Sequence, residues 1–242
     1  MIAAILGSVG FLTIVPSRKS LSRATFGAFP LTGAAIGALL GLLWLLSAAH
    51  MSALAAGAMV ILADAVITGA LHLDAVADCG DGLIAHLDRS SRLRVMSDPH
   101  LGAFGAVALV TVEIARYSVF ASSPGALVAM ILCYGLSRSA MAIVALYLPA
   151  AKPGSLIGAF GRGEIHGPSK VTDVIIAIEV GALVLWGLSY YGLRFMVATL
   201  VGSLFGAALV LRAKYALGGV TGDVVGASGV LFETAFLLAL LR

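Results

Sequence analysis

Long apolar runs follow one another along almost the whole chain, and they constrain its fold more than any other feature. Each run is close to the length of about 20 residues that a helix needs to cross a bilayer. Seven windows of this kind occur, at residues 29–49, 52–73, 101–121, 125–148, 171–190, 193–211 and 224–241. The sequence therefore predicts an all-α fold, a polytopic transmembrane helical bundle with about seven spans.

The first sixteen residues are also apolar, but they are marginal in length for a span and lack the features of a signal peptide. We expect residues 1–16 to form an interfacial helix that stays in the mature chain. No hydrophilic insert long enough to fold alone interrupts the sequence, so residues 1–242 are expected to form a single integral-membrane domain.

The composition excludes a water-soluble globule, because 60% of the residues are hydrophobic and 11% are charged. A net charge of +3 does not indicate a nucleic-acid partner, since the basic residues lie in short loops without an accompanying aromatic stripe. The expected partner of the surface is the lipid bilayer.

Basic residues occur in every second loop, which is the pattern that the positive-inside rule describes. The intervening connections hold only Arg194, with Arg242 at the far end. We therefore expect a multi-pass protein of the cell (cytoplasmic) membrane whose basic segments face the cytoplasm. These segments carry Arg18, Lys19 and Arg23, then Arg89, Arg92 and Arg94, then Lys152, Arg162 and Lys170, and finally Arg212 and Lys214.

Three aspartates, Asp74, Asp78 and Asp81, stand at the end of the second apolar window. On a regular helix their spacing places all three on one face. Carboxylates crowded at membrane depth repel one another unless a cation lies between them. Oxygen ligands favour a hard cation, most plausibly Mg²⁺, which also binds substrate phosphates. The pattern predicts a metal-dependent phosphoryl-type transfer at a membrane surface.

Two further segments carry candidate chemistry on the same predicted side. Asp98 precedes Pro99, so it is expected either to cap a helix that starts there or to act as a metal ligand or general base. The glycine-rich run 218–226 contains Thr221, Gly222 and Asp223. Its backbone N–H groups suit a phosphate, and Asp223 is expected to coordinate metal or to cap the following helix.

Charged residues inside the apolar windows need partners. Glu113 and Arg116 are one helical turn apart and are expected to neutralise each other. Arg138 has no partner nearby in the sequence, so it is expected to face an acid on another helix or a phosphate.

Several motifs in this order resemble the cobalamin-5′-phosphate synthase family, whose enzymes are also called adenosylcobinamide-GDP ribazoletransferases. The resemblance implies a Mg²⁺-dependent, multi-pass membrane enzyme that joins adenosylcobinamide-GDP to α-ribazole or its 5′-phosphate and releases GMP. The motifs are Phe29-Pro30-Leu31-x-Gly33, His72-Leu73-Asp74-x3-Asp78-x2-Asp81-Gly82, Met96-Ser97-Asp98-x2-Leu101-Gly102-x2-Gly105, Ser137-Arg138 and Gly218-Gly219-x-Thr221-Gly222-Asp223-x2-Gly226-Ala227.

The resemblance also implies roles for individual residues. Metal is assigned to Asp78 and Asp81, with Asp74 as a further ligand, and Asp98 is the first candidate for the general base, with Asp74 as a second catalytic carboxylate. Two positions depart from the family pattern, since Ile14 and His100 stand where arginine is common. The substrate phosphates are therefore assigned to Arg92, Arg94 and Arg138, together with Thr221, Gly222 and Asp223.

Two other functions fit part of the sequence. The run Asp78-x2-Asp81-Gly82-x2-Ala85 matches the first half of the CDP-alcohol phosphotransferase signature, but His86 stands where that signature continues with arginine. An ion-coupled transporter also has acids and glycines in its helices. Against it, the acids gather at one membrane face and no inverted repeat is evident. The sequence leaves open whether the chain forms a homo-oligomer.

Overall fold

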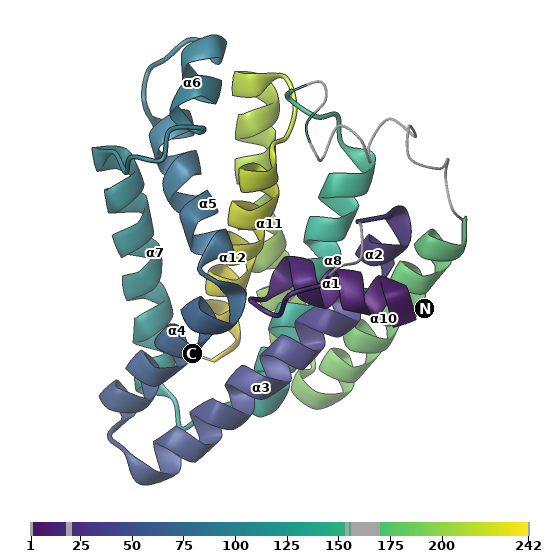
Figure 1. Ribbon diagram of the computed structural model, residues 1–242. Helices are drawn as coiled ribbons and strands as arrows, with labels where there is room; N and C mark the ends of the chain where they lie inside the picture. The colour runs from purple at the N-terminus through teal and green to yellow at the C-terminus, as the bar shows by residue number, and fades with distance from the viewer. Residues whose placement is uncertain (1, 18–20, 153–154, 156–169, 242) are drawn as a thin grey trace.

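The computed structural model describes residues 2–17, 21–152, 155 and 170–241, and Figure 1 shows them as a bundle of helices. Among these residues there is no strand, only an isolated bridge between Ala150 and Val220. The helices are α1 (Ile2–Leu12), α2 (Arg23–Gly27), α3 (Phe29–His50), α4 (Ala53–Thr68), α5 (Leu71–Cys79), the π-helical turn η1 (Gly80–Ile84), α6 (Arg89–Val95), α7 (Ala103–Ser122), α8 (Leu127–Tyr147), α10 (Lys170–Tyr191), α11 (Leu193–Leu217) and α12 (Gly222–Leu240).

The expected all-α membrane bundle is confirmed. Within the described ranges, six helices are long and apolar enough to cross a membrane. The count rises to seven if α4 and the α5–η1 segment, which are joined by a bend, are taken together as one span. The six are α3, α7, α8, α10, α11 and α12. They coincide with six of the apolar windows to within a few residues, except that α11 continues to Leu217, beyond the window's end at residue 211.

The apolar window at residues 52–73 does not form one continuous helix. Helix α4 ends at Thr68, and the chain bends by 95° before α5 begins at Leu71. Gly69 and Ala70 at the bend both have positive φ, at 63° and 56°, a conformation that ends a helix easily at glycine and is strained at alanine. The bend turns α5, with its aspartates, toward the end of the bundle that carries α6 (Figure 1).

The centre of the bundle is formed by α8 and α12, whose apolar windows are 67% and 78% buried. Helix α3 packs closely along α8 because Gly33, Gly37 and Gly41 present no side chain to it. A Cβ atom on Gly41 would lie 2.9 Å from Leu127 Cα, and one on Gly37 would collide with the backbone of Met130. Small residues at this spacing allow membrane helices to approach one another.

Two arginines inside the bundle are paired with acids. Arg116 donates to Glu113 at 2.8 Å, as expected, and also to Asp64 at 2.5 Å and to the hydroxyl of Tyr134 at 3.0 Å. Arg138 forms a buried ion pair with Glu233 on α12. Of the two alternatives for Arg138, an acid on another helix is the one found. Paired in this way, these charges can lie among apolar side chains.

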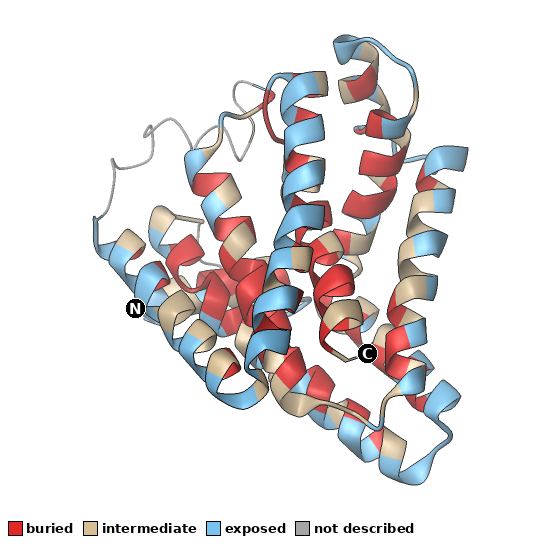
Figure 2. Ribbon diagram, turned by 180° about the vertical axis from the view of Figure 1, so that it is seen from behind, coloured by how far each residue is buried: buried red, intermediate tan, exposed pale blue. Residues whose placement is uncertain are grey.

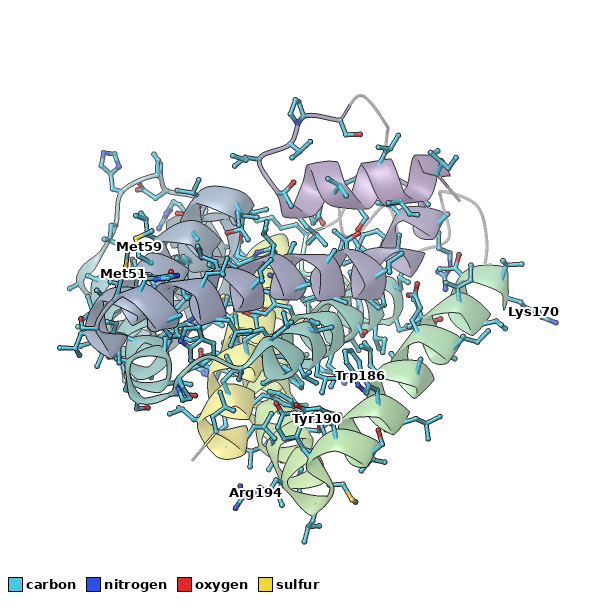
Figure 3. All side chains as sticks on the ribbon, turned by 90° about the horizontal axis from the view of Figure 1, so that it is seen from below. Met51, Met59, Lys170, Trp186, Tyr190 and Arg194 are labelled. Atoms are coloured by element: carbon cyan, nitrogen blue, oxygen red, sulfur yellow. The ribbon has the colours of Figure 1, made fainter. Side chains whose placement is uncertain are left out.

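The outer helices expose their apolar side chains. Only 22%, 22% and 28% of the spanning windows of α7, α10 and α11 are buried, and Figure 2 shows exposed residues along the outside of the bundle. Trp186, Tyr190 and Arg194 gather where α10 meets α11 (Figure 3). Aromatic and basic residues are typical of the membrane–water interface.

The loops expected on one side of the membrane meet at one end of the bundle. Helix α6, residues 148–152 after α8 and the α11–α12 connection lie at the top in Figure 1, whereas the turns α3–α4 and α7–α8 lie at the opposite end. Helix α1 lies across the bundle (Figure 1), and its expected interfacial location stays a prediction. Of the basic residues used to predict orientation, Arg18, Lys19, Arg162 and Arg242 lie outside the described residues.

Candidate active site

Hydrogen bonds tie three chain segments together at this end of the bundle. Arg89 on α6 donates to the carbonyl oxygens of Leu217 at 2.7 Å and Ala151 at 2.8 Å. The backbone N–H of Ala151 donates to the carbonyl of Val220 at 2.8 Å. Lys152 reaches the Ser97 hydroxyl at 2.8 Å. The segments 79–102, 148–152 and 217–223 therefore form one connected surface.

Asp74 and Asp78 are the carboxylates on this surface that accept no hydrogen bond within the described part of the chain. They lie one turn apart on α5 and line a cavity of about 230 Å³ with Ser97, Asp98 and His100. The negative charges of Asp74, Asp223 and Asp81 all act on Asp78. The bend after α4 and the return of the chain through α6 bring these acids together.

Asp81 does not lie on the regular helix that carries Asp74 and Asp78, so the spacing of the three aspartates alone does not give the direction of its side chain. Helix α5 ends at Cys79, and the π-helical turn that follows changes the rotation per residue. The Asp81 carboxylate instead turns toward the start of α7. It accepts N–H bonds from Gly102 at 2.7 Å and Gly105 at 2.8 Å, so it satisfies backbone donors that this helix start would otherwise leave unpaired.

Asp98 lies on the exposed loop between α6 and α7. No helix starts at Pro99, contrary to one alternative, because α7 begins at Ala103. The Asp98 carboxylate instead accepts the backbone N–H of His100 at 3.0 Å and lies 2.6 Å from the His100 ring nitrogen Nδ1. These contacts hold the pKa of the Asp98 carboxyl below its ordinary value, so this carboxylate is ionised at neutral pH.

The glycine-rich segment forms the start of α12. The Thr221 hydroxyl caps the helix by accepting the N–H of Val224 at 3.3 Å. Asp223 therefore does not serve as the helix N-cap, and it lines a second cavity with Thr221, Gly222 and Lys152. The charge of Lys152 attracts the Asp223 carboxylate, and that of Asp74 repels it.

The three arginines expected to bind phosphate lie in different surroundings. Arg92 is buried and donates to the carbonyl of Gly82 at 2.6 Å. Arg94 is exposed and lines an open cavity of about 610 Å³ with Ser90, Asp98, His100 and Lys152. Arg138, held by Glu233, is buried within α8. Of the three, Arg94 is the arginine at the cavity that borders Asp98.

Three residues at the site were missed by the sequence analysis. Lys152 was counted only as a loop charge, yet it lines both the open cavity and the one that contains Asp223. Ser97 borders all three cavities. His72 is buried and lines the cavity of Asp223. His72 and Ser97 stand inside the family motifs, but those motifs drew attention to their aspartates. Lys152 stands in no motif, so nothing in the sequence near it indicates a role at the site.

The cavity beside Asp223 has a volume of about 290 Å³ and is lined by both polar and apolar residues. The polar lining residues are His72, Ser97, Lys152, Ser155, Thr221 and Asp223. The remaining lining residues are Gly222, Gly226 and the apolar residues Phe11, Phe26, Phe29, Leu71, Ala75, Leu93, Met96, Met141 and Val225. This cavity shares Met96 and Ser97 with the cavity of Asp74 and Asp78, so the two cavities adjoin.

The donor atoms of this surface fit a hard divalent cation. Asp74 and Asp78 offer carboxylate oxygens without protein partners, and mutual repulsion among the acids is relieved by positive charge. In the described ranges, no three His, Cys, Asp or Glu side chains converge closely enough to form a complete metal site. Mg²⁺ suits such an open set, because it keeps several waters and takes other ligands from substrate phosphates.

Comparison with known proteins gives a consistent result. The family model described as "Cobalamin-5-phosphate synthase" matches residues 4–241. A protein of Sinorhizobium medicae named "Adenosylcobinamide-GDP ribazoletransferase" is 34% identical, and the match covers 96% of this chain and 94% of that protein. A protein of the same name from Pseudomonas paraeruginosa is 33% identical, with 98% and 97% covered. No solved structure matches the chain significantly.

Proposed function

The chain belongs to the cobalamin-5-phosphate synthase family, and we propose that it catalyses the reaction for which its relatives are named. The donor is adenosylcobinamide-GDP and the acceptor is α-ribazole or its 5′-phosphate. The ribose 3′-oxygen of the acceptor forms a bond to the phosphorus next to cobinamide. The bond from that phosphorus to the bridging oxygen breaks, GMP leaves, and the hydroxyl proton passes to a base.

The observation that carries this proposal is a small cavity that Asp74, Asp78 and Asp98 line together. Within the described part of the chain, neither Asp74 nor Asp78 accepts a hydrogen bond. Acids to hold a cation and a further carboxylate to accept a proton are what attack of a hydroxyl on a diphosphate requires. Positive side chains border the same region, since Lys152 and Arg94 line the adjoining open cavity. These cations suit the charge of the diphosphate.

We assign a bound Mg²⁺ to Asp74 and Asp78, with Asp81 as a third ligand. Both oxygens of Asp81 accept N–H bonds, but a carboxylate has about four acceptor positions, so it retains capacity for a cation. When bound, the metal would neutralise charge on the diphosphate oxygens. Asp81 would then join the start of α7 to the same site.

Asp98 remains our candidate for the base, because it borders the acids and is ionised at neutral pH. Arg94 and Lys152 are assigned to the phosphates of the two substrates, with the backbone of Thr221 and Gly222. Arg92 positions the site through the carbonyl of Gly82. Arg138 is assigned to the buried pair with Glu233. The relatives named above support this transferase and offer no support for a phospholipid synthase or a transporter.

The basic residues at this end of the bundle support a location in the cell membrane with the active site facing the cytoplasm. Arg89, Arg94, Lys152 and Arg212 all belong to the segments gathered there. This orientation would expose the cavities to water-soluble nucleotides.

The test is an assay of membranes that contain the protein. With adenosylcobinamide-GDP, α-ribazole 5′-phosphate and Mg²⁺, we expect release of GMP, and chelation of the metal should abolish it. A CDP-activated lipid with an alcohol serves as the competing substrate pair. Release of CMP from that pair, without release of GMP from the first, would overturn the proposal.

A further inference from the structure

The cavity beside Asp223 is lined by a buried histidine, His72, whose imidazole ring lacks hydrogen-bond partners in the described part of the chain. His72 is 4% exposed, and neither of its ring nitrogens has a hydrogen-bond partner among the residues that the structure describes. A buried donor or acceptor left without a partner is destabilising. His72 lines the wall of this cavity together with the aromatic side chains.

The wall around His72 suits a flat aromatic group. Phe29 contacts the rings of both Phe26 and Phe11, with centroid distances of 4.9 Å and 5.8 Å. The cavity volume of about 290 Å³ is roughly twice the 150 Å³ of an apolar protein cavity that accepts benzene. A fused two-ring system is of that size.

We propose that this cavity receives the benzimidazole base of the α-ribazole acceptor, and that His72 hydrogen-bonds the free nitrogen of that base. The inference rests on the proposed function and assigns the acceptor to one part of the same site. The ribose attached to the base would then extend past Ser97 toward Asp74 and Asp98, where its hydroxyl must react. Both cavities share Ser97 and Met96.

The donor substrate carries two other aromatic groups, guanine and the adenine of its adenosyl group, and both fit the apolar part of the cavity wall less well. Each of these purines has several hydrogen-bond donors and acceptors around its edge, and most of them would lose water against the phenylalanine, methionine and aliphatic side chains there. A methylated benzimidazole presents one free ring nitrogen and otherwise apolar atoms. One unpartnered histidine in an apolar wall matches that chemistry.

The experiment reduces the cavity and measures each substrate separately. Ala75→Leu adds bulk from α5, since Ala75 lines the cavity and is 5% exposed. We expect its KM for the dimethylbenzimidazole acceptor to rise at least about tenfold, with a smaller rise for the acceptor that has an unmethylated benzimidazole. Its KM for adenosylcobinamide-GDP should stay unchanged. Ala115→Leu, in a groove between α7, α11 and α12, is the matched control and should leave both KM values unchanged.

A second pair of variants tests His72 directly and leaves Ala75 unchanged. His72→Phe should raise the KM for the dimethylbenzimidazole acceptor about tenfold through loss of one hydrogen bond, and His72→Gln, which keeps an N–H donor, should restore part of it. Equilibrium dialysis of α-ribazole 5′-phosphate against the purified protein in detergent should show the same order of affinities, independently of turnover.

The outcomes separate this inference from the proposed function. Absence of GMP release by the unsubstituted protein contradicts the transferase itself. If GMP is released but Ala75→Leu raises the KM for adenosylcobinamide-GDP instead, the cavity holds part of the donor. If both substitutions leave acceptor affinity unchanged in proteins of normal thermal stability, the cavity does not bind the base.

Discussion

At the scale of single residues, the carboxylates of the site differ in what already surrounds them. Asp81 and Asp98 accept hydrogen bonds from backbone N–H groups, whereas Asp74 and Asp78 have no such partner in the described ranges. A carboxylate that the fold leaves unpaired is the one most available to a cation. The chemistry of each acid therefore depends on contacts that its position in the motif does not reveal.

Asp78→Asn tests the metal assignment. We expect turnover to fall at least about a hundredfold, because the site loses a carboxylate that is assigned to Mg²⁺, and the bound cation would stabilise negative charge in the transition state. Expression should persist, since a neutral amide is easier to bury than a carboxylate. GMP release measured over a range of Mg²⁺ concentrations checks this.

The control for this substitution is Asp88→Asn at the same end of the bundle. Asp88 is exposed and accepts the N–H of Ser91 at 2.8 Å as the cap of α6, and asparagine caps about as well. Turnover of this control should be unchanged. Near-full activity of Asp78→Asn at limiting Mg²⁺ would show that Asp78 is not a ligand.

Asp98→Asn separates a base from a residue that only shapes its loop. An amide can still accept the N–H of His100, so a purely structural role predicts a nearly silent substitution. An amide cannot accept the hydroxyl proton, so we expect the rate to fall by roughly 10²–10⁴ while the donor substrate still binds. Single-turnover rates and donor affinity measured together distinguish these roles, and wild-type turnover would move the search for the base to Asp74 or Asp223.

At the scale of elements, the π-helical turn after α5 decides how two helices meet. Gly80 and Gly82 allow this turn to lie against its neighbours, since a Cβ on Gly80 would be 2.8 Å from the Cβ of Ala108 and one on Gly82 would collide with Met96. Asp81, between them, then reaches the start of α7. With the proposed Mg²⁺ bound to Asp81, metal binding and the position of α7 would be coupled through one side chain.

Asp81→Asn tests this coupling. Both Asp81 oxygens accept an N–H from the start of α7, whereas asparagine has one acceptor oxygen, so it keeps one of these bonds and leaves the other donor unpaired. We therefore expect thermal stability to fall by about 1–3 kcal/mol. Turnover of the folded protein should fall about a hundredfold, because the amide is a poor ligand for Mg²⁺ beside Asp78. Thermal unfolding and GMP release are measured on the same preparation. Unchanged turnover would limit Asp81 to the cap of α7.

At the scale of the whole molecule, the bundle places its acids, its open cavity and its basic loops at one end (Figure 1). Buried pairs such as Arg138–Glu233 hold charges in the interior without exposing them to lipid. The outer helices present apolar side chains, including Val107, Ile178 and Leu200, which are 61–65% exposed. This distribution suits a protein with lipid around it and water at its two ends.

The orientation is tested by labelling from each side of the membrane. A cysteine replacing Ser90 on α6 should react with an impermeant thiol reagent only from the cytoplasmic side, and one replacing Ser123 after α7 only from outside. The native Cys79 and Cys133 are buried, so the unsubstituted protein serves as the low-background control. Labelling of both positions from the same side would overturn the predicted span count.

The sequence alone determined the architecture and the region of the site. A run of apolar residues is a local property, and the length needed to cross a bilayer is set by the membrane, so the spans could be located without a structure. Charges in alternate loops predicted which segments gather at one end. The acids of that end were recognised because carboxylates beside an apolar span require an explanation.

Tertiary structure decided which side chains meet. Arg116 pairs with Asp64, 52 residues away, and Lys152 with Ser97, 55 residues away, and such contacts depend on how far each helix is rotated and tilted. The bend at Gly69 and Ala70 and the π-helical turn after Cys79 change that rotation abruptly. A helical periodicity continued through them therefore does not give the direction of the Asp81 side chain. The cavity around His72 exists only because seven helices close around it, and no spacing along one of them reveals it.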